Sequence, residues 1–210
     1  MVNLYPQLIK IPAFMTKFIN INNLNFFKKL FLIFKGKLTI FVFSLKSQKI
    51  ICFYLNNFFV FDGKLIYEDG NYIKLTDAKK IYYPNLRISR ILIDENEFLD
   101  FIFNSYLLSN ISFDKRDLVL DCGANVGELF LSFKNKNIDI EYIGIEPDQN
   151  AYFCLNKNTS SKNINICLSN SKGKVDFFID EVGANSSIHE STTTHKKQQI
   201  DSDKIDNIFL

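Results

Sequence analysis

The chain has 210 residues, 47% of them hydrophobic and 15% aromatic, and a formal net charge of +2. This length suffices for one ordinary domain with a small additional lobe, and the composition indicates a folded chain rather than a disordered one. Lysines interrupt the apolar run at residues 30–43, so the remaining pieces are too short to cross a bilayer. The four cysteines are widely spaced, which predicts neither a zinc site nor a disulfide framework and fits a reduced, cytoplasmic protein.

Charge is distributed unevenly along the chain. Eight lysines and no acidic residue precede Asp62, whereas the remainder is mildly acidic. A basic, apolar segment of this kind suits peripheral contact with an anionic membrane, near which each lysine contributes about 1 kcal/mol. The alternative is that the segment packs on the protein, since residues 1–46 have no clear amphipathic period and are expected to be helical or irregular. Scattered lysine pairs do not form a nucleic-acid-binding track.

Short runs of β-type residues follow, and we expect strands at residues 50–55, 58–61, 65–67 and 72–75. Asp62-Gly63 and Asp69-Gly70 lie between such runs. Asp-Gly favours a two-residue hairpin turn because that turn requires positive φ angles. The sequence therefore predicts a small antiparallel meander.

A helix is predicted over residues 95–109. Asp94 and Glu97 have the spacing of a capping box, in which each side chain accepts a hydrogen bond from a free backbone N–H at the helix start. Apolar residues recur behind it at i, i+4 and i+8, so the helix has a stripe for core packing.

From residue 117 onward, strands and helices alternate. The pattern predicts strands at 117–121, 141–146 and 164–168, with helices at 126–135 and 149–158 between them. The strand segments are continuously apolar, which is typical of a parallel sheet covered on both faces. We therefore expect an N-terminal lobe over residues 1–111, consisting of the basic segment, the meander and a helix, and an α/β domain over 112–210.

An acidic residue and two glycines follow the first of these strands, in the order Asp121, Gly123, Gly127. Ligands of parallel sheets bind beyond the carboxyl ends of the strands. A dinucleotide fingerprint would have glycine at positions 125 and 128, where this chain has Asn125 and Glu128, so pyrophosphate is an unsuitable ligand. A carboxylate here attracts a cation, such as the amino group of S-adenosylmethionine.

Glu146 ends the next strand, about 20 residues beyond the glycines. A carboxylate at this place in the fold accepts hydrogen bonds from ribose hydroxyls. The two strand ends together favour a nucleoside with a cationic amino-acid group.

Three segments, DLVLDCGANVGEL, YIGIEPDQNAYFCLNKN and INICLSNSKGKVDFF, resemble in this order the opening motifs of the FkbM-type methyltransferase family. The resemblance covers about residues 115–210 and implies a Rossmann-like sheet and O-methylation of a hydroxyl on a sugar, glycan or secondary metabolite, with S-adenosylmethionine as cofactor and no metal. It also implies that Glu146 binds the ribose. The other implied cofactor contacts are Asp121, Gly123, Asn125, Gly127 and, near the adenine, Ser169 and Asn170.

The chain departs from the family at several positions. Cys122 replaces another small apolar residue, and Ser169 and Asn170 have the alternative role of capping the turn before Gly173. Family members continue beyond the strand-like stretch at 205–210 with a Lys-Ile-Asp-type segment that should line the methyl-transfer pocket. The sequence thus leaves open an active enzyme and a truncated, non-catalytic relative that acts as an interaction module.

The sequence identifies no catalytic base, acceptor or oligomeric state. His189 and His195 lie in a polar stretch and are more typical of a surface loop than of a general base. Cys122 and Cys167 have no neighbouring histidine and are more typical of core residues than of nucleophiles.

Overall fold

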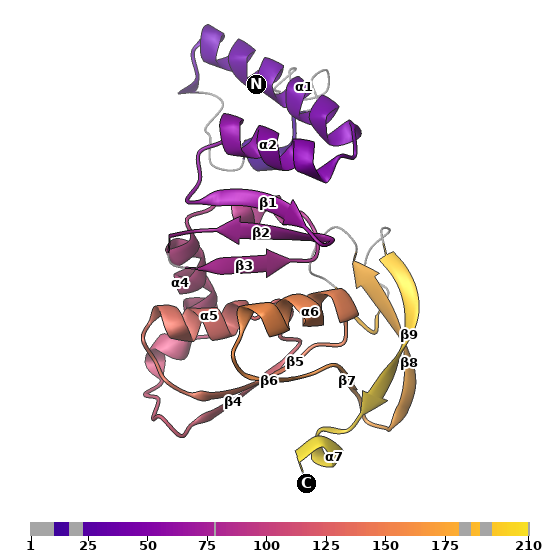
Figure 1. Ribbon diagram of the computed structural model, residues 1–210. Coiled ribbons are helices and arrows are strands. Elements are labelled where there is room, and N and C mark those ends of the chain that lie inside the picture. Colours follow the sequence, from indigo (N-terminus) through magenta and orange to yellow (C-terminus); the bar gives the residue numbers. More distant parts are fainter. Residues whose placement is uncertain (1–10, 17–22, 78, 181–185, 190–194, 210) are drawn as a thin grey trace, which may run out of the picture. The chain divides into compact units, whose positions relative to one another are not determined.

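The structure, a computed structural model, describes residues 11–16, 23–77, 79–180, 186–189 and 195–209 (Figure 1). The chain divides into two compact units, Met1–Val60 and Phe61–Leu210. The described part is mixed α/β, with seven α-helices and three small sheets. None of its helices has the length and hydrophobicity needed to cross a membrane.

The first unit is helical. Its elements are a 3-10 helix η1 (Ala13–Met15), α1 (Phe26–Ser44) and α2 (Gln48–Phe58). The buried hydroxyls of Thr39 and Tyr54 are hydrogen-bonded at 2.8 Å and join the two long helices. The strands predicted at 50–55 and 58–61 are wrong: Ile51, Cys52 and Leu55 are buried at helical spacing, so α2 presents an apolar stripe where a strand would alternate.

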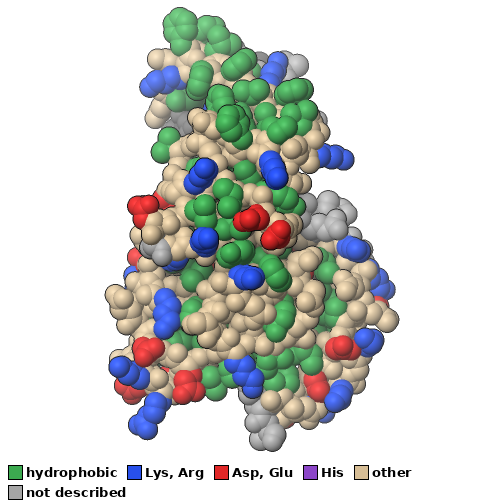
Figure 2. Space-filling model, viewed as in Figure 1, with side chains coloured by type: hydrophobic (Ala, Val, Ile, Leu, Met, Phe, Trp, Pro, Cys, Tyr) green, Lys and Arg blue, Asp and Glu red, His purple; other side chains and the backbone are tan. Residues whose placement is uncertain are grey.

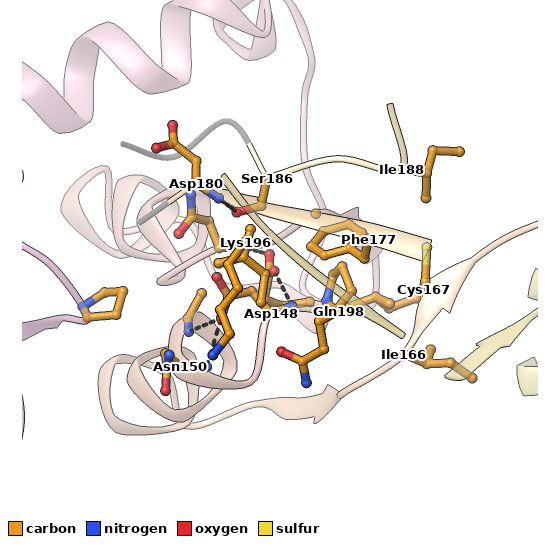
Figure 3. Close-up of a pocket in the computed structure, with 18 of the residues that line it drawn as sticks. Asp148, Asn150, Ile166, Cys167, Phe177, Asp180, Ser186, Ile188, Lys196 and Gln198 are labelled. Atoms are coloured by element: carbon orange, nitrogen blue, oxygen red, sulfur yellow. Dashed lines mark hydrogen bonds between the residues drawn. The ribbon is translucent and has the colours of Figure 1, made fainter. Parts of the chain in front are cut away.

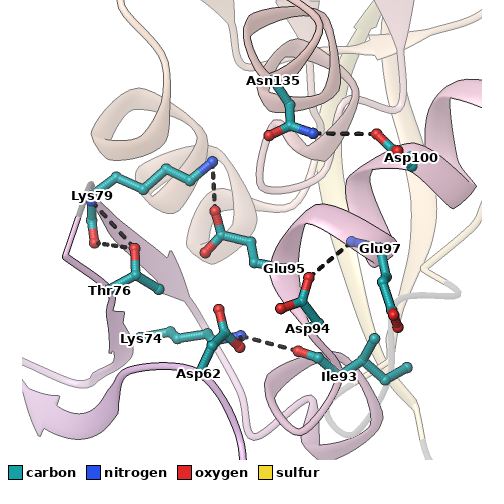
Figure 4. Close-up of polar contacts among 10 residues, drawn as sticks. All are labelled: Asp62, Lys74, Thr76, Lys79, Ile93, Asp94, Glu95, Glu97, Asp100 and Asn135. Carbon is teal, nitrogen blue, oxygen red and sulfur yellow. Dashed lines mark hydrogen bonds and ion pairs between the residues drawn. The ribbon is translucent and has the colours of Figure 1, made fainter.

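An antiparallel meander opens the second unit. Its strands are β1 (Lys64–Glu68), β2 (Asn71–Leu75) and β3 (Lys80–Tyr83), of which β3 was not predicted. Asp69 and Gly70 connect β1 to β2 with φ angles of 49° and 82°, as a type I′ hairpin turn requires, so this prediction is confirmed. Asp62-Gly63 precedes β1 and joins no two strands, so this part of the hairpin prediction is wrong. Asp62 instead pairs at 2.5 Å with Lys74, whose side chain is 1% exposed (Figure 4).

Two helices follow the meander, α3 (Ile88–Ile91) and α4 (Glu95–Ser105). The Asp94 carboxylate accepts the backbone N–H of Glu97 at 3.1 Å, which confirms the predicted helix start (Figure 4). The helix is shorter than the predicted 95–109, because Leu107 is left-handed with φ 57° and separates α4 from a 3-10 helix η3 (Leu108–Asn110).

Three parallel strands form one sheet in the order β4-β5-β6, in which the first two are the predicted ones and the third contains only Ile164 of the strand predicted at 164–168. Its strands are β4 (Leu118–Cys122), β5 (Glu141–Ile145) and β6 (Lys162–Ile164), connected by α5 (Glu128–Asn135) and α6 (Gln149–Asn158). Helix α6 has the predicted bounds because the Asp148 side chain caps it, accepting the N–H of Asn150 at 2.9 Å. The strand–helix alternation of this region is confirmed.

A third sheet has the order β7-β9-β8, with β9 parallel to β7 and antiparallel to β8. Its strands are β7 (Cys167–Leu168), β8 (Gly173–Asp180) and β9 (His195–Asp203). The single strand predicted at 164–168 is therefore divided between two sheets. The strand expected at 205–210 is wrong, since the helix α7 (Ile205–Phe209) forms there. The Asp203 carboxylate precedes this helix and accepts hydrogen bonds from the Lys204 backbone N–H at 2.8 Å and from the Asn207 side-chain amide at 2.6 Å.

The meander is connected to the parallel sheet through Asn158, at the end of α6. Its side chain accepts the N–H of Tyr82 at 2.8 Å and donates to the carbonyls of Tyr82 and Val126 at 3.0 and 2.8 Å. These bonds satisfy the N–H and carbonyl of Tyr82 at the edge of β3, and the meander and the parallel strands belong to the same unit. The boundary predicted at residues 111 and 112 lies inside this unit.

Candidate functional site

A cavity of about 560 Å³ lies where β4 and β5 end, and strands β8 and β9 form its other wall (Figure 3). Its volume is within the range of small-molecule sites. Three residues predicted from the sequence line it: Gly123, Asn125 and Glu146. The structure thus brings the two predicted strand ends together around one space.

The turn after β4 has left-handed backbone at Gly123, Asn125 and Gly127, with φ angles of 89°, 52° and 86°. A Cβ atom at Gly123 would meet nothing within 4 Å, so this glycine leaves open space beside the cavity. A Cβ atom at Gly127 would lie 2.6 Å from Cγ2 of Thr159, so this glycine permits close packing of the turn on α6. The first glycine therefore serves the cavity and the second serves the core.

The Glu146 carboxylate fixes the geometry of the turn. The side chain is 5% exposed; Oε2 accepts the N–H of Asn125 at 2.7 Å and Oε1 accepts the N–H of Asp148 at 2.8 Å. Each carboxylate oxygen has a further lone pair for a ligand hydroxyl. Burial raises the pKa of Glu146 to about 7, although the two backbone donors and the Arg87 guanidinium oppose this shift.

Asp121 lies on β4, one residue before its end, and is half-buried. Its carboxylate accepts a hydrogen bond from the Tyr142 hydroxyl on the neighbouring strand. Burial raises the pKa of Asp121, and the hydrogen bond from Tyr142 lowers it. The carboxylate is thus hydrogen-bonded to a neighbouring strand of the sheet. Asp121 is not among the described residues that line the cavity.

Ser169 and Asn170 follow β7. The Ser169 N–H donates to the carbonyl of Asp203 at 3.0 Å, and its hydroxyl accepts the N–H of Ser171 at 3.4 Å. The first contact continues the pairing of β7 with β9, and the second is local and fits the turn role that the sequence left open for Ser169. The two residues immediately before them, Cys167 and Leu168, line the cavity.

The sequence did not predict that Arg87 belongs to the site. It precedes α3 and lines the cavity, and its Nη2 donates to Oδ1 of Asn125 at 2.7 Å. Residues 1–114 carry no motif that would indicate this role. One signal was present: the chain uses only three arginines among 25 basic residues, and arginine is preferred over lysine where a planar, forked donor is needed.

The wall formed by β8 and β9 was also not predicted. It contributes the buried ring of Phe177 and the side chain of Ile179, together with the polar side chains of Lys196 and Gln198 (Figure 3). The cavity therefore has an apolar surface from β8 beside polar side chains from β9, in addition to the polar turn. This arrangement suits a ligand with a flat apolar part and a hydroxylated part.

The histidines and possible metal ligands add no further chemistry to the described cavity. His189 is exposed, and its backbone N–H donates to the Ser187 hydroxyl at 3.0 Å. The side chain of His195 lies outside the described residues. Within the described ranges no cluster of histidine, cysteine and acidic side chains could hold a metal ion. Cys122 lines the cavity and is exposed as a residue, but partial desolvation of its thiol and the neighbouring Asp121 charge raise its pKa, which disfavours a nucleophilic thiolate.

Comparisons of the chain with models of protein families, with curated proteins and with solved structures find no match. A functional assignment therefore depends on the cavity and on the residues that line it.

Proposed function

We propose that the chain is an S-adenosylmethionine-dependent methyltransferase with a Rossmann-like, FkbM-type core over residues 112–210. The proposed reaction is O-methylation of a hydroxyl on a small molecule, most simply a sugar, glycan or secondary metabolite. One observation carries the proposal: Gly123, Asn125 and Glu146 surround a single cavity beyond the carboxyl ends of two parallel strands. That is where parallel sheets bind nucleoside cofactors.

The cavity walls match the parts of the proposed cofactor. The free lone pairs of Glu146 can accept the two ribose hydroxyls, and the open side of Gly123 admits the ligand close to the backbone. Phe177 and Ile179 offer an apolar surface for the adenine. When bound, the cofactor supplies the methyl group through its sulfonium, and the protein contributes by holding the acceptor hydroxyl in line with it.

Calorimetry with S-adenosylhomocysteine tests this proposal. Replacing Glu146 with alanine removes the acceptor of two ribose hydroxyls and should weaken binding by about 1–3 kcal/mol. Glu141→Ala is the matched control, because Glu141 is exposed at the start of β5, whereas Glu146 directly follows the end of this strand. Equal affinity of wild type and Glu146→Ala, or preference for NAD, contradicts the proposal. In the alternative, a non-catalytic interaction module, the cavity would show no saturable binding of the nucleoside.

We also infer a peripheral membrane role for the first unit, on the cytoplasmic side. Helix α1 exposes Phe27, Phe31 and Phe34 on one face, with exposed fractions of 76%, 66% and 65% (Figure 2). The exposed Lys28 and Lys29 lie on the same helix, and no acidic residue precedes Asp62. An apolar face accompanied by unopposed positive charge favours an anionic lipid surface, where a lipid-linked acceptor would be found.

A further inference from the structure

The Arg87 guanidinium has an incomplete set of partners inside the cavity wall. The residue is 7% exposed and lines the same cavity as Gly123 and Asn125, although it comes from the segment that follows the meander. The segment after the meander and the ends of the parallel strands therefore both contribute to one site.

The described partners of Arg87 are neutral. Nη2 donates to Oδ1 of Asn125 at 2.7 Å, and Nε donates to Oδ1 of Asn85 at 3.1 Å. Nη1 is buried and has no hydrogen-bond partner among the residues that the structure describes. The neighbouring Arg90 differs, because it forms an ion pair with Glu128 at 2.6 Å.

A buried guanidinium with amide hydrogen-bond partners and an unsatisfied nitrogen is costly, since it has lost water and its nearby counter-charge, Glu128, is already ion-paired with Arg90. Burial accordingly lowers the pKa of Arg87, against the opposing effect of Glu128. The Nη1 and Nη2 atoms form one edge of the guanidinium, and the N–H groups of that edge match the two oxygens of a carboxylate. A ligand carboxylate would supply the missing acceptor and a negative charge that Arg87 does not share with Arg90.

Asn125 connects this cation to Glu146. Its backbone N–H donates to Glu146 and its side chain accepts from Arg87, so the carboxylate and the guanidinium lie on either side of one residue. A ligand that places ribose hydroxyls on Glu146 has its other end near the turn, within reach of Arg87. Two neighbouring groups of opposite charge fit one molecule that carries both hydroxyls and a carboxylate.

We infer that Arg87 binds the carboxylate of the amino-acid portion of S-adenosylmethionine. This inference rests on the proposed function and adds to it a recognition residue from outside the Rossmann-like core. Arg87 thereby distinguishes the complete cofactor from adenosine derivatives that lack the amino-acid carboxylate.

Two ligands isolate this contact: S-adenosylhomocysteine, and its decarboxylated form, which keeps the amino group and lacks the carboxylate. Calorimetry on the full chain should show that Arg87→Gln weakens binding of S-adenosylhomocysteine by about 10- to 100-fold. The same variant should bind the decarboxylated ligand as the wild type does, within about twofold. Arg116→Gln, which removes an exposed arginine outside the cavity, is the matched control and should change neither affinity.

Arg87→Lys keeps the positive charge but lacks the planar, forked donors of arginine. Its affinity for S-adenosylhomocysteine should therefore lie between those of the wild type and Arg87→Gln, and its affinity for the decarboxylated ligand should be unchanged. If both Arg87 variants lose affinity for both ligands equally, Arg87 only supports Asn125 and the inference is overturned. If the wild type binds both ligands equally well, the proposed function stands and the inference fails. If it binds neither ligand, both fail.

Discussion

Glu146 is a buried carboxylate whose two described hydrogen bonds come from backbone donors. Its pKa is raised to about 7, above the value of roughly 4.3 for glutamate in an unfolded chain. The protonated form is therefore favoured in the folded state, and its contribution to stability is present at low pH and is lost as the pH rises through about 7. Ribose hydroxyls donate to the ionised form and would reverse this preference.

Binding of S-adenosylhomocysteine should strengthen as the pH rises. At pH 6 roughly one molecule in ten has Glu146 ionised if its pKa is 7, so affinity should be about tenfold weaker than at pH 8. Calorimetry at pH 6, 7 and 8 measures the change, and Glu146→Gln should bind weakly without this pH dependence. A wild-type affinity that does not vary over this range would show that ionisation of Glu146 is not linked to binding.

The two glycines of the turn should respond differently to alanine. Gly127→Ala combines a left-handed backbone with a 2.6 Å contact to Thr159, and should lower the free energy of unfolding by about 2–4 kcal/mol. Gly123→Ala has open space around the new methyl group, so only backbone strain of about 1–2 kcal/mol is expected. Urea unfolding of both variants checks this order, and a larger loss for Gly123→Ala would contradict it.

Individual site residues could be predicted where the chain itself places them at strand ends. Gly123, Asn125 and Glu146 follow apolar strands directly, so local sequence was enough to locate them at the cavity. Arg87 and Phe177 come from segments paired with distant parts of the chain, and no local pattern marks their approach.

Helix α1 exposes several large hydrophobic side chains. Its exposed Phe27, Phe31 and Phe34 are spaced four and three residues apart, which places them on one face of the helix. Its other face is apolar as well and contains the buried Leu32 and Val42. The helix is thus apolar around most of its circumference, which explains why the sequence has no clear amphipathic period.

The protein should sediment with vesicles of phosphatidylcholine and phosphatidylserine at low salt and be released at high salt. The double variant Lys28→Glu, Lys29→Glu should lose at least tenfold in affinity, since each lysine near an anionic surface contributes about 1 kcal/mol. Lys115→Glu, an exposed lysine of the second unit, is the control. Wild-type protein that stays in the supernatant with these vesicles at low salt rules out the membrane role.

Helix starts were more predictable than helix ends. The capping box located the start of α4 but not its end, whereas both bounds of α6 followed from the strand–helix alternation. Helix α2 was mistaken for a strand because its residues, such as Ile50, Ile51 and Phe53, are also good strand formers, and packing on α1 decides between the two. The break after Ile164 was not predictable, because β7 pairs with β9, more than 30 residues further along the chain.

At the scale of the whole molecule, the mixed α/β class and the parallel order of β4, β5 and β6 follow from the alternating pattern. The division into three sheets does not, because it depends on which distant strands pair. The site nevertheless forms at the predicted sheet edge, and the β8–β9 wall and the segment after the meander complete it. Assembly of the second unit therefore determines the cavity more than any single motif does.

A crystal structure of the protein grown with S-adenosylhomocysteine would show directly whether the cavity binds the cofactor. We expect the nucleoside in the cavity at the ends of β4 and β5, with both ribose hydroxyls donating to the Glu146 carboxylate and the backbone of Gly123 against the ligand. An empty cavity at saturating ligand, or a ligand bound elsewhere without contact to Glu146, would contradict the account.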